Sequence, residues 1–75
     1  MKYTEEMKLW LFDLAHGNLT DDEIVKGFIK HYVMNGCTIH DVHNHIHFHT
    51  NYGRHGAEKA MDALHNALEK FAEGR

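Results

Sequence analysis

Histidine stands out among the residues that could do chemistry, because the chain has nine histidines in 75 residues. Neutral imidazoles bind zinc, nickel and copper when several of them can reach one ion. In a helix, His40, His43 and His47 would lie along one side, where Cys37 or Asp41 could supply a fourth ligand. On this helical interpretation, the sequence offers a candidate site for zinc or another transition metal, formed by Cys37, His40, His43 and His47.

An extended conformation would bring a different set of histidines together. Polar and apolar residues alternate from His45 to His49, so three imidazoles would point one way and Ile46 and Phe48 the other. Neither of the usual zinc spacings, C-x-x-C and H-E-x-x-H, occurs in the chain. The alternative to a metal site is that the histidines are polar or half-buried residues around a small core.

Groups that could act in catalysis are sparse. Cys37 and His40 could form a thiolate–imidazole pair. A chain of 75 residues offers little room, however, for a substrate pocket of several hundred Å³. We therefore expect a non-enzymatic protein without catalytic residues.

Capping residues and glycines mark two helices in the first half of the chain. Thr4 is expected to cap a helix that stops at Gly17, and Thr20 with Glu23 forms the capping box of a second helix. Gly27 inside the second helix indicates the close approach of another backbone. The wide apolar face of this helix is formed by Ile24, Val25, Phe28, Ile29 and Tyr32.

The second half of the chain ends in an amphipathic segment that predicts a helix over about residues 57–72. The histidine-rich segment 38–55 is expected to form a short helix to about residue 47 and then a turn, with a hairpin as the alternative. The sequence thus predicts a single all-α domain over residues 1–75, built as a compact bundle of three to four helices. The inward face of the last helix is expected to consist of Ala60, Met61, Leu64, Ala67, Leu68 and Phe71.

The first helix has more apolar surface than one buried face requires. Leu9 and Phe12 lie on the side opposite to its main apolar face. Exposed leucines and aromatic residues that lie together usually mark an interface. Burying a large apolar side chain contributes roughly 1.5–3 kcal/mol, so Leu9 and Phe12 could support association. We therefore predict that Leu9, Trp10 and Phe12 contact a protein partner, while the main apolar face packs inward through Met7, Trp10, Leu11 and Leu14.

The net charge argues against nucleic-acid binding at neutral pH. It is −3 with neutral histidines, whereas nucleic-acid-binding proteins usually carry a basic excess. Protonation of all nine histidines would carry the net charge from −3 to +6, so its sign could reverse in mildly acidic conditions. Asp21, Asp22 and Glu23 form an acidic patch that we expect to contribute to partner binding.

The chain shows no sequence signal for export or membrane insertion. Its longest uninterrupted apolar run has four residues, far fewer than the roughly 20 of a membrane-spanning helix. A single cysteine excludes an internal disulfide, which suits a reducing cytoplasm. In size and charge the protein resembles the small inhibitors that phages and mobile elements direct against host proteins. The resemblance implies a cytoplasmic regulator whose partner is a host enzyme or a nucleic-acid-associated protein, with a second copy of the chain as the alternative partner and no membrane contact.

The segment from Thr38 to Met61 supports an alternative function. Val42, Ile46 and Phe48 have the spacing of the three core residues of a helix-turn-helix unit, and Thr50-Asn51 could cap its second helix. Over about a third of the chain, the sequence therefore resembles a helix-turn-helix DNA-binding unit. The resemblance implies that DNA would be contacted by Asn51, Arg54, His55 and Lys59.

Overall fold

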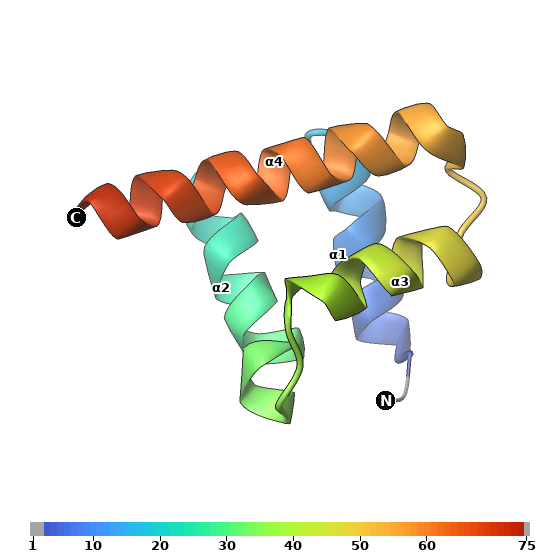
Figure 1. The fold of residues 1–75 in the computed structure, drawn as a ribbon, viewed down its shortest axis with the longest axis horizontal. Coiled ribbons are helices and arrows are strands. Elements are labelled where there is room, and N and C mark those ends of the chain that lie inside the picture. The colour runs from blue at the N-terminus through green and yellow to red at the C-terminus, as the bar shows by residue number, and fades with distance from the viewer. Residues whose placement is uncertain (1–2, 75) are drawn as a thin grey trace.

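The computed structural model describes residues 3–74. Within this range the chain forms α-helices and one short 3₁₀ helix, and no strand. The helices are α1 (Glu5–Ala15), α2 (Asp21–His31), α3 (Ile39–His49) and α4 (Gly53–Gly74), with the short 3₁₀ helix η1 (Val33–Asn35) after α2 (Figure 1). The predicted all-α bundle is confirmed. The hairpin alternative for the histidine-rich segment is wrong, because that segment forms α3.

The first three helices each begin at a threonine. Thr4 Oγ1 accepts a hydrogen bond from the backbone N–H three residues on, at 3.1 Å. Thr20 and Glu23 form the predicted capping box, with distances of 3.2 and 2.9 Å. A second capping box joins Thr38 to Asp41, whose carboxylate accepts a hydrogen bond from Thr38 N at 2.8 Å. The starts of α1, α2 and α3 are therefore fixed by local hydrogen bonds.

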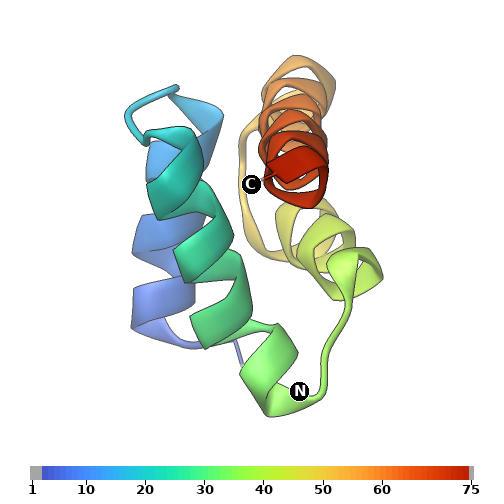
Figure 2. The ribbon, with the colours of Figure 1, turned by 90° about the vertical axis from the view of Figure 1, so that its left-hand side faces the viewer.

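The α-helices form two layers (Figure 2). α1 and α2 run in opposite directions in one layer, and α3 and α4 run in opposite directions in the other (Figures 1 and 2). α4 has 22 residues, twice as many as each other α-helix, and it packs across both α1 and α2. Because a helix of this length spans about 33 Å, the C-terminal end of α4 extends beyond α2 (Figure 1).

The core lies between the two layers. On the inner face of α4, Ala60 and Ala67 lie about one turn on either side of Leu64, and all three are fully buried. Small side chains at these positions let α4 approach the first layer closely. The largest fully buried side chains opposite and beside them are Leu11, Leu14, Tyr32 and Val42.

The start of α4 differs from the sequence prediction, since the helix begins at Gly53 rather than near residue 57. Gly53 has a φ of 72° and makes the turn out of α3. Only glycine fits at position 56 without a shift of its neighbours, because a Cβ there would lie 2.7 Å from the Cβ of Tyr52. The two glycines therefore belong to the helix start, where they make room for the turn that precedes it.

Gly27 in the middle of α2 makes room for a side chain. The indole of Trp10 lies directly against this glycine, and a Cβ at Gly27 would overlap the ring. The predicted close approach of another backbone is therefore wrong, because the group that lies against Gly27 is a side chain of α1.

A buried polar contact joins α3 to the end of α2. Tyr32 Oη and His45 Nδ1 lie 2.8 Å apart, and both side chains are buried. Tyr3 packs on the same cluster, edge-on to His45 and stacked on His49. Burial raises the pKa of the Tyr32 hydroxyl and lowers the pKa of His45, because both charged forms lose solvation. At neutral pH the contact is therefore a hydrogen bond between a neutral tyrosine hydroxyl and a neutral imidazole.

Candidate interaction surfaces

The outward side of α1 carries an apolar stripe. Leu9 and Phe12 are 58% and 47% exposed, so their predicted exposure is confirmed. His16, one turn after Phe12, stacks its ring on the phenyl ring with centroids 4.1 Å apart. The His16 Nδ1 also lies 2.8 Å from the Phe12 carbonyl oxygen, which holds the imidazole in this position. Leu9, Phe12 and His16 are called the α1 stripe below.

Trp10 lies on the inner side of the same helix. Only 7% of it is exposed, and its ring packs against Gly27 and near Tyr32. Its indole N–H has no hydrogen-bond partner within residues 3–74. Trp10 is thus a core residue, because α1 buries its indole against α2, and its contact with a partner stays a prediction.

The acidic patch at the start of α2 is engaged within the chain. Asp21 lies 2.8 Å from the ammonium of Lys70 on α4, and Asp22 lies 3.0 Å from Lys26. Glu23 accepts the hydrogen bond of the capping box. These contacts account for the acidic side chains as capping and surface-pairing groups, and their role in partner binding stays a prediction.

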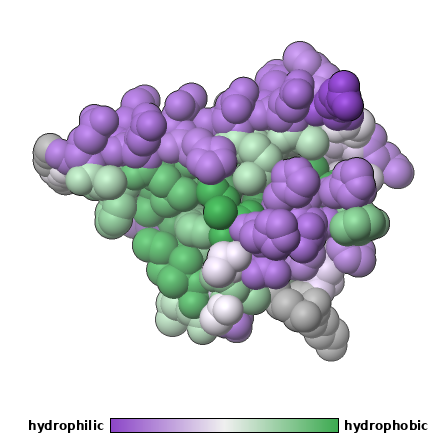
Figure 3. All heavy atoms as spheres, in the orientation of Figure 1, coloured by the Kyte–Doolittle hydropathy of each residue, from purple (hydrophilic) through white to green (hydrophobic). Residues whose placement is uncertain are grey.

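A second apolar area lies over α2 and η1, below the C-terminal part of α4 (Figure 3). The large apolar side chains exposed on these elements are Ile29, Val33, Met34 and Phe71, which are called the α2–α4 face below. The sequence predicted that Phe71 belongs to the inward face of α4. This prediction is wrong, because Phe71 is 64% exposed, next to Lys70, which pairs with Asp21 at the first residue of α2. Ile29 belongs to the predicted apolar face of α2 but is 37% exposed.

The residues predicted to contact DNA gather where α3 leads into α4. Asn51 lies in the connecting turn, and Arg54, His55 and Lys59 lie in the first turns of α4. All four are exposed. The structure therefore places the predicted set around the α3–α4 turn, but Arg54 faces a different hollow from His55 and Lys59.

The arrangement of these helices differs from that of a helix-turn-helix unit. Phe48 is 71% exposed instead of packing in a core between the helices. The Thr50 hydroxyl donates to the Ile46 carbonyl oxygen at 2.6 Å, so Thr50 completes the end of α3 and does not cap α4. α3 and α4 also run back along each other (Figure 1), whereas the helices of that unit cross at about 90–120°.

The four predicted metal ligands do not form a cluster. No group of three or more His, Cys, Asp or Glu side chains within the described part of the chain is placed to hold an ion. His43 and His47 lie one turn apart with parallel rings, and their centroids are 6.3 Å apart. His40 and His47 are separated by seven residues, or about 10 Å along the helix axis. Cys37 precedes α3 altogether.

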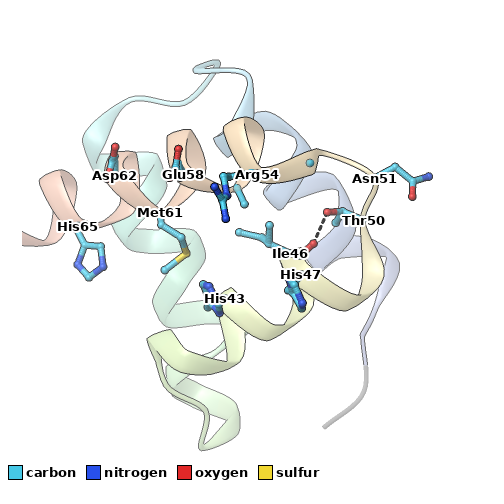
Figure 4. A pocket seen from close by; sticks show the side chains of 12 residues that line it. His43, Ile46, His47, Thr50, Asn51, Arg54, Glu58, Met61, Asp62 and His65 are labelled. Carbon is cyan, nitrogen blue, oxygen red and sulfur yellow. Dashed lines mark hydrogen bonds between the residues drawn. The ribbon is translucent and has the colours of Figure 1, made fainter.

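A groove of about 870 Å³ separates α3 from α4 (Figure 4), so the expectation that the chain has little room for a pocket of several hundred Å³ is wrong. Its apolar lining comes from Ile46, Ala57 and Met61. His43 and His47 line it from α3, and the polar residues that line it from α4 are Arg54, Glu58, Asp62 and His65. This α3–α4 groove unites residues that the sequence assigned to two separate predictions, a metal site and a DNA-binding surface. The sequence analysis did not predict His65 or Met61 as site residues. Their spacing of 11 and 7 residues from Arg54 could have indicated that all three lie on one side of α4.

A smaller hollow of about 440 Å³ lies where the end of α1 meets the start of α4. His16, Tyr52, His55 and Lys59 are among the residues that line it. The rings of His16 and Tyr52 meet edge-on with centroids 6.3 Å apart. The α1 stripe therefore continues through His16 into a hollow with basic side chains.

Within residues 3–74, no helix has the length and apolar character needed to cross a membrane. Comparisons of the chain with models of protein families, with curated proteins and with solved structures found no match.

Proposed function

We propose that the protein is a non-enzymatic regulator that acts by binding a protein partner through the α1 stripe. The observation that carries this proposal is the exposure of Leu9 and Phe12 on a helix whose other side fills the core. Neither side chain is needed to complete the buried cluster between the two layers. Apolar side chains that lie together on a folded surface are typical of interaction sites.

The energetics support an anchoring role for these residues. About half of each side chain is exposed, so burying both contributes roughly 1.5–3 kcal/mol. This gain corresponds to about 10- to 100-fold in a binding constant. Association also has an entropic cost, so the interface must extend beyond the two residues. His16 and the hollow that it lines with Tyr52 and Lys59 provide the adjoining surface.

The double substitution Leu9→Ser/Phe12→Ser tests the proposal. Because both side chains lie outside the core, the variant should keep the far-ultraviolet circular dichroism of the parent. It should lose the partner that the parent chain captures from a lysate of its source cells, as quantified by mass spectrometry. Sedimentation velocity of the purified chain shows whether the captured partner is another protein or a second copy.

The double substitution Ile29→Ser/Val33→Ser is the matched control, since it makes the same chemical change on the α2–α4 face. This variant should retain the partner. Equal capture by the parent and the α1 variant, or loss of the partner from the control alone, would contradict the proposal.

A further inference from the structure

The α3–α4 groove contains a cation that has no partner within the described part of the chain. Arg54 makes no hydrogen bond or ion pair with any residue from 3 to 74, although Glu58 lies one turn away, at a spacing that permits a pair. Figure 4 shows the Arg54 side chain directed from α4 toward α3. Glu58 and Asp62 also line the groove, and Figure 4 shows their carboxylates directed away from Arg54. The guanidinium therefore faces the groove without an acidic neighbour in front of it.

Three histidines along the groove supply further hydrogen-bond donors. His43 and His47 face it from α3, and His65 hangs beside it from α4 (Figure 4). Imidazole N–H groups donate hydrogen bonds, and they gain positive charge when protonated. Together with Arg54, they give the groove a set of donors suited to an anionic group.

The groove also offers apolar surface next to these donors. Ile46, Ala57 and Met61 line it, and the Met61 side chain is directed from α4 toward His43 (Figure 4). Small-molecule sites combine an apolar lining with a few polar groups, in volumes of roughly 300–1,000 Å³. The volume of about 870 Å³ falls in this range.

We propose that the α3–α4 groove binds a small organic anion with an apolar body, such as an aromatic carboxylate or sulfonate. The anionic group lies against Arg54, whose planar guanidinium binds such groups through two parallel hydrogen bonds. The apolar body lies along Ile46, Ala57 and Met61. This site goes beyond the proposed partner binding and uses none of the residues of the α1 stripe, so either proposal can fail without the other.

Two fluorescent probes test the site, 8-anilinonaphthalene-1-sulfonate and its uncharged counterpart N-phenyl-1-naphthylamine. The Arg54→Gln variant should weaken binding of the sulfonate by about 3- to 10-fold, as expected for one charge-assisted contact that stays partly in water. Binding of the uncharged probe should stay within about twofold of the parent. The matched control Lys59→Gln removes one cation from the same helix outside the groove, and it should leave both affinities unchanged.

The apolar side of the site is tested with a pair of methionine substitutions. Met61→Gln should weaken binding of both probes, because both place their rings on this side chain. Met34→Gln changes an exposed methionine of η1 and should weaken neither probe. Circular dichroism confirms that each variant is folded before titration.

The proposal is overturned if Arg54→Gln and Lys59→Gln affect the sulfonate equally. It is also overturned if Met34→Gln weakens binding as much as Met61→Gln does, because the probes then bind the exposed α2–α4 face. In ¹⁵N-labelled protein, the amide shifts that move with the sulfonate should cluster at residues 43–61. A cluster at residues 29–34 would assign the probe to the other surface.

Discussion

At the scale of single residues, Trp10 and Gly27 depend on each other. The indole occupies the volume that any larger residue at position 27 would need. Alanine favours a helix interior by about 1 kcal/mol over glycine, whereas overpacking a core costs about 1–3 kcal/mol. Helix propensity therefore favours alanine at position 27, whereas packing against the Trp10 indole favours glycine. The packing cost is the larger of the two, so glycine fits.

We predict that Gly27→Ala lowers the free energy of unfolding by about 1–2 kcal/mol, because the new methyl group displaces the Trp10 ring. Urea denaturation followed by circular dichroism measures the change. In a Trp10→Phe background, the smaller ring leaves room, so the same substitution should cost less and the double-mutant cycle should show coupling. Equal costs in the two backgrounds would show that the indole is not the obstacle.

At the scale of elements, the sequence predicts those features that depend on residues close together in the chain, such as helix starts. The starts of α1 and α2 follow from Thr4 and Thr20, whose side chains cap the helices as expected. Phe71 was assigned to the core because it continues the periodicity of α4. Its exposure depends on how α4 lies against α2, and the periodicity of a single helix carries no information about its neighbour.

The candidate sites likewise include one that a single helix predicts and one that depends on the packing of two helices. Leu9 and Phe12 could be placed outside the fold because they lie opposite a complete apolar face on one helix. The α3–α4 groove could not be predicted, since it depends on how two helices diverge after the turn at Gly53. Sequence spacing alone assigned His43 to a metal site and Arg54 to DNA, and only the packing of α3 against α4 makes them neighbours of one groove.

Tyr32 and His45 make the contact that should matter most between α3 and the end of α2. We predict that Tyr32→Phe lowers the free energy of unfolding by about 1–3 kcal/mol, because it leaves the buried His45 Nδ1 without its hydrogen-bond partner. Tyr52→Phe is the matched control, since the Tyr52 hydroxyl makes no hydrogen bond within residues 3–74. Thermal denaturation of both variants tests this, and equal stability of the two would show that the buried bond contributes little.

At the scale of the whole molecule, protonation of histidine is coupled to folding. Burial is the main cause that lowers the pKa of His45, and the nearby His49 adds to it. Asp41 acts in the opposite direction. Burial followed by the charge of Lys30 also lowers the pKa of His31, which packs near the Trp10 ring. In the unfolded chain these histidines return to an ordinary pKa near 6.5.

A lowered pKa in the folded state means that the unfolded chain takes up protons first as the pH falls. The contribution of His45 and His31 to stability is therefore fully present above about pH 6.5 and declines as the pH falls from there toward their native pKa values. We predict that the free energy of unfolding decreases between pH 7.5 and pH 5, and that the double variant His31→Gln/His45→Gln shows a flatter dependence. Urea titrations across this range measure both slopes. Each unit by which the folded state lowers a histidine pKa corresponds to about 1.4 kcal/mol of stability lost at low pH. A double variant with the full slope of the parent would mean that other groups govern the acid sensitivity of the fold.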